Sequence, residues 1–189
     1  MTRLTRSVTT AALAVTSALV LAACGGDKGA PADSAAAPAA EPAAAPAAAA
    51  PAAAAAPSTE QLVAIGKEKY GQICATCHQQ NGQGLEGNFP PLAGSTWLLG
   101  NAEVPISIVL NGLQGEIEVN GKKYNGIMSP WNSLSDEEIA GVLTYVRQEW
   151  GNAAPPVLPA DVNAVRTRLG ERGMWTAEEL KKTYPGAGT

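Results

Sequence analysis

The stretch Cys74-Ala75-Thr76-Cys77-His78 decides how this chain of 189 residues is expected to fold. Two cysteines separated by two residues and followed directly by a histidine form the attachment pattern of a c-type haem, in which both thiols become thioethers and the imidazole binds the iron. In a helix, Cys74 and Cys77 lie three residues apart on one face, and His78 follows beside them. The spacing therefore predicts two covalent bonds and one axial bond from a single helical turn.

A Cys-x-x-Cys pair also occurs in zinc sites and in thioredoxin-like redox proteins. A structural zinc site needs four ligands, but the sequence has no second pair of this kind, and His78 is its only histidine. A thioredoxin-like pair belongs to a βαβ context, which the flanking sequence does not show. Both alternatives are therefore weaker than one covalently attached haem c.

Methionine is the other common axial ligand of a c-type haem, and this chain has three methionines. Met1 belongs to an N-terminal leader, and Met174 lies in a tail beyond the expected core. Met128 lies in residues 125–131 (NGIMSPW), where glycine and proline indicate a loop rather than a helix. A lone methionine is more often a filler of core gaps, but in this loop we expect Met128 to be the second axial ligand.

Residues 58–152 resemble a class I, monohaem cytochrome c. That family has an N-terminal helix, the Cys-x-x-Cys-His motif, a Pro-Leu segment, a middle helix, a methionine loop and a C-terminal helix, and each has a counterpart here. The resemblance implies an all-α cytochrome c fold with three to four helices around one haem. It also implies that the carbonyl of Pro90 accepts a hydrogen bond from His78. The family loop has Met-Pro and an aromatic residue, whereas here Ser129 separates Met128 from Pro130.

Local patterns predict the ends of the main elements. Ser58 and Gln61 form a capping box that starts a helix leading to the haem motif, and Ser135 and Glu138 form a second one that starts the C-terminal helix. Their apolar residues recur at helical spacing: Leu62, Ile65, Tyr70 and Ile73 in the first helix, and Ile139, Val142, Leu143, Val146 and Trp150 in the last.

Between these helices, the sequence predicts a helix over 104–111 and a small β-hairpin within 116–124. The hairpin turn is Asn120-Gly121, and the hairpin comes just before Met128. The family resemblance further implies that Gly66 and Tyr70 meet the C-terminal helix at Tyr145.

Residues 1–23 have the features of a signal peptide, because Arg3 and Arg6 precede an apolar run that ends in small side chains. Residues 21–25 (LAACG) resemble the lipobox of bacterial lipoproteins, which implies that Cys24 carries lipid. Acylation would also account for the one cysteine that the haem does not use. The alternative is an uncleaved leader that anchors the chain.

The predicted organisation has four parts. The lipoprotein signal peptide (1–23) is followed by a flexible tether rich in alanine and proline (24–57), the cytochrome c domain (58–152) and a C-terminal extension (153–189). The extension has weak helical patterns around 162–169 and 176–182. Its Met174 and Trp175 either pack on the domain or serve as a docking tail, and the sequence leaves both open.

The expected function is single-electron transfer rather than enzyme catalysis, because His78 and Met128 together leave no open position on the iron. The net charge of −4 without a basic run argues against nucleic-acid binding. Expected partners are redox proteins of the cell envelope, namely a quinol-oxidising complex, a terminal oxidase or reductase, or a dehydrogenase. The lipid anchor would place the protein on the periplasmic side of a membrane. The alternatives are a gas-binding sensor with a displaceable Met128 and a fixed cytochrome subunit of an oxidoreductase.

Overall fold

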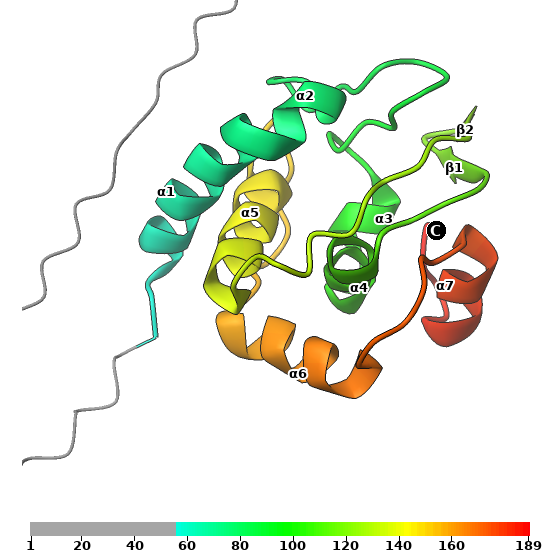
Figure 1. Ribbon diagram of the computed structural model, residues 1–189. Helices are drawn as coiled ribbons and strands as arrows, with labels where there is room; N and C mark the ends of the chain where they lie inside the picture. Colours follow the sequence, from blue (N-terminus) through cyan, green and yellow to red (C-terminus); the bar gives the residue numbers. More distant parts are fainter. Residues whose placement is uncertain (1–55) are drawn as a thin grey trace, which may run out of the picture. The chain divides into compact units, whose positions relative to one another are not determined.

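The computed structural model describes residues 56–189. Two helices from opposite ends of the expected domain, α1 and α5, lie side by side in it (Figure 1). The expected leader, Cys24 and nearly all of the tether lie outside the described residues. The elements are, in chain order, α1 (Thr59–Lys69), the π-helix η1 (Tyr70–Cys74), α2 (Ala75–His78), α3 (Thr96–Leu99), α4 (Glu103–Asn111), β1 (Ile117–Val119), β2 (Lys122–Tyr124), α5 (Asp136–Gln148), α6 (Pro159–Leu169) and α7 (Ala177–Thr183).

The starts of α1 and α5 are set by the two predicted capping boxes. The Ser58 hydroxyl accepts a hydrogen bond from the Gln61 amide at 3.3 Å, and the Gln61 side chain accepts one from the Ser58 amide at 2.8 Å. Ser135 and Glu138 make the same pair of bonds at 3.1 and 2.9 Å. Both predicted starts are confirmed, since each box satisfies two amides that a helix leaves without partners.

The α1 and α5 helices touch through their backbones at Gly66 and Gly141. A Cβ atom added at Gly66 would collide with the carbonyl oxygen of Gly141 and would lie 2.8 Å from Cβ of Tyr145. One turn further along, the rings of Tyr70 and Tyr145 pack with their centroids 5.5 Å apart. The expected meeting of Gly66 and Tyr70 with the C-terminal helix is therefore confirmed.

The predicted β-hairpin is also present. Strands β1 and β2 pair antiparallel, with Val119 opposite Lys122. Asn120 and Gly121 between them have φ values of 51° and 74°, and a two-residue hairpin turn needs positive φ at both positions.

The domain is mostly helical with one small two-stranded sheet, but residues 56–189 contain seven α-helices and a π-helix rather than the expected three to four helices. Two of the additional helices are single-turn segments: α2 is the end of the expected first helix, set apart from α1 by η1, and α3 forms in a stretch that was not expected to be helical. The other two, α6 and α7, come from the C-terminal segment, whose helical patterns were weak. Among residues 56–189, no helix combines the length and the apolar character needed to cross a membrane.

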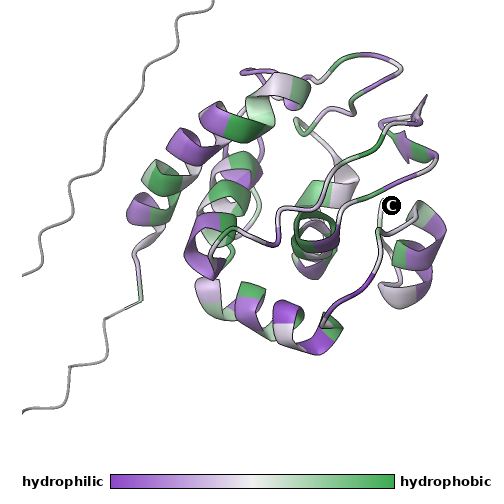
Figure 2. Cartoon of the chain, viewed as in Figure 1, coloured by the Kyte–Doolittle hydropathy of each residue, from purple (hydrophilic) through white to green (hydrophobic). Residues whose placement is uncertain are grey.

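The C-terminal segment packs on the rest of the domain, which decides between the two alternatives for residues 153–189. Val162 and Val165 of α6 are fully buried in a core shared with α1, α4 and α5, and α6 lies along one end of this group (Figure 1). Trp175 and Leu180 are buried in a second core with α4 and the hairpin. Figure 2 shows hydrophobic and hydrophilic residues interspersed along α6 and α7.

We predict that Gly66→Ala lowers the free energy of unfolding by about 2 kcal/mol, because the added methyl group forces the α1 and α5 backbones apart. Chemical denaturation of the purified protein measures the change. Gly71→Ala is the matched control, since a Cβ there meets nothing within 4 Å. Equal stability of the two variants would contradict the close helix contact.

Candidate functional site

The Cys-x-x-Cys-His motif spans the junction of η1 and α2 at the end of the first helix (Figure 1). The amide of Ala75 donates to the carbonyl of Tyr70, which is the five-residue spacing of a π-turn. The sequence predicted a continuous α-helix here and missed this turn. Cys74 and Cys77 are both free, half-buried thiols. Burial raises the pKa of the Cys74 thiol to about 11, and Cys77 adds to this shift, so Cys74 is neutral at physiological pH.

His78 is oriented by the segment that follows it. Its Nδ1 lies 2.9 Å from the carbonyl oxygen of Pro90. A carbonyl only accepts hydrogen bonds, so Nδ1 carries the proton and the lone pair of Nε2 is left for another partner. Burial lowers the pKa of His78, while the bond to Pro90 acts in the opposite direction. The imidazole is therefore held neutral, which is the state that binds a metal.

The motif opens on two adjoining cavities. Both are lined by Cys74, His78, Pro90, Leu113 and Met128. The remaining wall of the first cavity is almost entirely apolar and comes from the 90–98 segment, α4, the hairpin and α5.

These residues fit a covalently attached haem. Two unpaired thiols, a neutral imidazole and a thioether converge on one apolar crevice. Thioether formation at Cys74 leaves an uncharged sulfur, which suits a buried position. In the part of the chain that the structure describes, no three His, Cys, Asp or Glu side chains group together as metal ligands.

The backbone of Met128 is held by two hydrogen bonds. Its amide donates to the Leu113 carbonyl at 2.9 Å, and the Leu113 amide donates to the Met128 carbonyl at 3.0 Å. Three residues later, the Trp131 amide donates to the carbonyl of Val109 in α4 at 2.8 Å. The methionine loop is therefore tied to the end of α4, although Ser129 separates Met128 from the proline.

A cluster of three aromatic side chains lies next to the motif and bonds to the residues that follow it. Trp150 packs on Tyr70 and Tyr145, with ring centroids 5.2 and 5.8 Å away. Its indole donates to the carbonyl of Gln80 at 3.1 Å, and the Tyr70 hydroxyl donates to the carbonyl of Gln79 at 2.5 Å. Trp150 was expected in the apolar stripe of the last helix, but α5 ends at Gln148 and Trp150 turns back with a φ of 55°. The chain directly after His78 is fixed by these two bonds.

Sequence reasoning missed Asn152, a buried residue beside the site. Its side-chain amide donates to the carbonyls of Val146 at 2.7 Å and Leu92 at 3.3 Å, and its carbonyl accepts from the Gly94 amide at 2.8 Å. Asn152 thus joins the segment after Pro90 to α5. An isolated asparagine after a helix carries no sequence signal for this role.

Arg147 was also missed. It is buried on α5 and donates to the backbone carbonyls of Leu98, Gly100 and Pro155. Burial lowers the pKa of its guanidinium. The one available signal was an arginine inside an otherwise apolar stretch of helix. Its bonds join α3 and the chain after Asn152 to the helix that lines the crevice.

Helices packed around a crevice that presents two cysteines and a histidine in this spacing define a c-type cytochrome. Comparison with known proteins agrees. The cytochrome c family profile matches residues 63–150. Cytochrome c-552 of Thermus thermophilus is 53% identical over 94 residues, which cover 48% of this chain and 71% of that relative. The chain belongs to the cytochrome c family.

More distant relatives are subunits of larger enzymes. The cytochrome c subunit of the quinone alcohol dehydrogenase of Gluconobacter oxydans is 34% identical over 116 residues, which are 54% of this chain but 22% of that subunit. The cytochrome c subunit of gluconate 2-dehydrogenase from Pantoea cypripedii is 33% identical over 110 residues, or 24% of its length. This chain thus spans about a quarter of the length of these subunits.

The family membership confirms three predictions. The protein is a monohaem c-type cytochrome, its cofactor is a covalently bound haem c, and it transfers electrons rather than catalysing a reaction itself. The Cys-x-x-Cys-His motif formed by Cys74, Cys77 and His78 is the attachment pattern of that haem.

Proposed function

We propose that the protein carries single electrons with a haem held by thioethers at Cys74 and Cys77 and by axial bonds from His78 and Met128. The observation that carries the proposal is that His78 and Met128 both line each of the two cavities beside the motif. When bound, the haem supplies an iron that gains or loses one electron. His78, oriented by Pro90, and Met128, held by Leu113, would bind that iron and leave it no place for other ligands.

A thioether ligand favours the reduced state of the iron and raises the potential. The apolar wall acts in the same direction by excluding water from the crevice. These properties suit a carrier between a donor such as a quinol-oxidising complex or a dehydrogenase and a terminal oxidase or reductase. The relatives that are dehydrogenase cytochrome subunits support a second arrangement, in which the protein works as a fixed subunit of such a complex.

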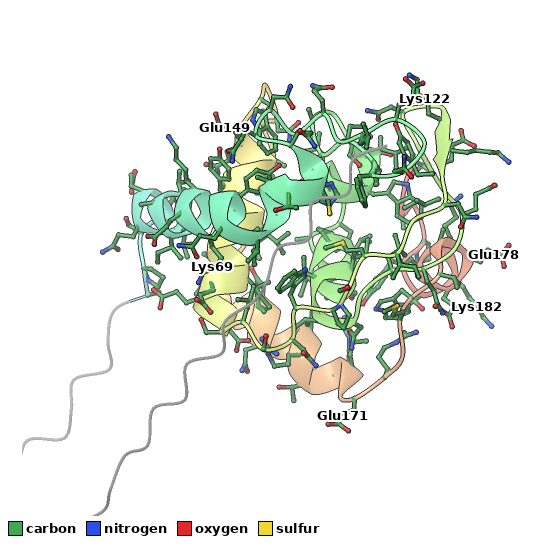
Figure 3. The ribbon with its side chains drawn as sticks, turned by 45° about the horizontal axis from the view of Figure 1, so that its top comes forward. Lys69, Lys122, Glu149, Glu171, Glu178 and Lys182 are labelled. Carbon is green, nitrogen blue, oxygen red and sulfur yellow. The ribbon has the colours of Figure 1, made fainter. Side chains whose placement is uncertain are left out.

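Electrons would enter and leave through the second cavity. Its lining includes Ile127, whose side chain is 68% exposed, and the half-buried Cys77 and Phe89. Nearby charge is paired, because Lys122 lies 2.8 Å from Glu86. Figure 3 shows Lys122 on the hairpin at the edge of the domain, and Glu178 and Lys182 together on α7. The surface around the second cavity therefore suits apolar docking of a partner, at a rate that depends only weakly on salt.

The membrane attachment remains a proposal that rests on the sequence. Residues 21–25 carry the lipobox-like pattern, and Cys24 would bear the lipid that holds the protein to the periplasmic side of a membrane. Two or more acyl chains would give stable attachment.

We predict that Met128→Leu abolishes the methionine-to-iron charge-transfer band of the oxidised protein and lets the reduced protein bind CO rapidly. Absorption spectroscopy and flash photolysis measure both effects. Met174→Leu is the matched control and keeps the band. Persistence of the band in Met128→Leu would remove Met128 as the ligand, and rapid CO binding by the unaltered protein would favour a gas-binding domain instead.

We predict that Ile127→Lys lowers the electron self-exchange rate about tenfold, because it places like charges opposite each other when two openings meet. NMR line broadening in mixtures of oxidised and reduced protein measures this rate. Leu158→Lys adds the same charge at an exposed residue that lines neither cavity, and its rate should stay close to that of the unaltered protein. Equal slowing by both variants would argue against this docking face.

We predict that the mature chain begins at Cys24 and incorporates labelled fatty acid in a bacterial host, whereas Cys24→Ser incorporates none. Intact mass and fatty-acid labelling provide the readouts. Ser34→Ala is the control variant, and it should incorporate the labelled fatty acid like the unaltered chain. A mature chain that keeps residues 1–23 would support the uncleaved anchor instead.

A further inference from the structure

Three segments that are far apart in the sequence lie edge to edge beside the proposed axial methionine. The middle one is residues 112–114, which follow α4. On one edge, Leu113 exchanges its two backbone hydrogen bonds with Met128 at 2.9 and 3.0 Å. On the other edge, the Trp175 amide donates to the Gly112 carbonyl at 3.0 Å, and the Gln114 amide donates to the Trp175 carbonyl at 2.9 Å. Residues 112–114 are therefore bonded to Met128 on one edge and to the C-terminal segment on the other.

The backbone of Gly112 lies close to both neighbouring segments. Gly112 has a φ of 78°, a conformation that favours glycine. A Cβ there would lie 2.6 Å from the Met128 carbonyl oxygen and 3.2 Å from Cγ of Met174. Movement of the C-terminal segment away from residue 112 would therefore open space directly beside the backbone of Met128.

The side chain of Trp175 fixes its segment in this position. It is 2% exposed, its ring centroid is 6.2 Å from that of Tyr184, and the Arg172 guanidinium lies 3.1 Å from its centre. Tyr184 follows α7, and its hydroxyl lies 2.7 Å from the Ser107 hydroxyl, so the segment is also bonded to α4. The indole nitrogen of Trp175 is buried without a hydrogen-bond partner in the described residues, so the side chain is held by packing of its ring.

We propose that Trp175 is a positioning residue for the methionine ligand: it holds residues 112–114 against the Met128 loop and so slows the departure of Met128 from the iron. The inference rests on the proposed ligation by His78 and Met128. Loops open locally when few buried contacts hold them. Here some of the contacts that resist opening come from the C-terminal segment, which is bonded to the other edge of residues 112–114.

The test compares Trp175→Ala with a variant that destabilises the protein elsewhere. Val162→Ala/Val165→Ala removes two fully buried side chains from α6, which belong to the other core. The readouts on the holoprotein are the rate of CO binding to the reduced form, the charge-transfer band of the oxidised form, and hydrogen exchange of the Met128 amide. Trp175→Leu gives the same comparison if Trp175→Ala does not accumulate.

We expect Trp175→Ala to speed CO binding and amide exchange at Met128 about tenfold, a typical size for coupling between two sites. The double valine variant should lower the free energy of unfolding but leave the CO rate within about twofold, since α6 makes no backbone hydrogen bond to residues 112–114. Trp175→Phe should resemble the unaltered protein, because the indole nitrogen has no partner to lose.

Equal CO rates in Trp175→Ala and the double valine variant would overturn the positioning role. It would also be overturned if Trp175→Phe sped CO binding as much as Trp175→Ala does. Met128→Leu is measured alongside them. Loss of its band together with equal rates in the other variants would refute the role of Trp175 alone, whereas persistence of its band would refute the ligand itself.

Discussion

The direct contact of the α1 and α5 backbones at Gly66 and Gly141 is the constraint on which the rest of the structure depends. It brings the two ends of the domain sequence within side-chain distance, so that Tyr70, Tyr145 and Trp150 form one cluster behind the haem motif. The same helix pair sets one wall of the crevice, because α1 leads into the motif and α5 contributes apolar lining residues. A larger residue at either glycine would change the spacing of both.

The site itself is organised by backbone carbonyls. Pro90 fixes the proton on Nδ1 of His78, which leaves Nε2 unprotonated, and Leu113 holds the backbone of Met128. Tyr70 and Trp150 bond to the carbonyls directly after His78. Because these acceptors belong to the main chain, the orientation of the proposed ligands depends on how the loops are folded and little on which side chains the loops carry. This also explains how the loop accommodates Ser129 between Met128 and the proline.

The C-terminal segment adds contacts that hold the methionine loop in place. The backbone of Met128 is paired with Leu113, and the segment around Leu113 is in turn paired with Trp175. The energetic cost of opening the loop therefore includes contacts made more than forty residues away in the sequence. In the proposed function this matters because a carrier needs the same ligands in both oxidation states, whereas a gas-binding domain needs one ligand to leave.

The sequence by itself determined the features that depend on neighbouring residues. The haem motif, both capping boxes and the Asn120-Gly121 turn were readable because spacing and local backbone preference are enough to specify them. The choice of cofactor, the family and the mostly helical class follow from these signals.

Only the tertiary structure decided the features that depend on distant contacts. The weak helical patterns of α6 and α7 gave no sign that packing on α4, α5 and the hairpin would order them, since most helical stability comes from burying an apolar face. Asn152, Arg147 and Trp175 likewise act through carbonyls or rings elsewhere in the chain. The sequence shows which hydrogen bonds and contacts a side chain can make. Its partner is known only once the fold has brought distant residues together.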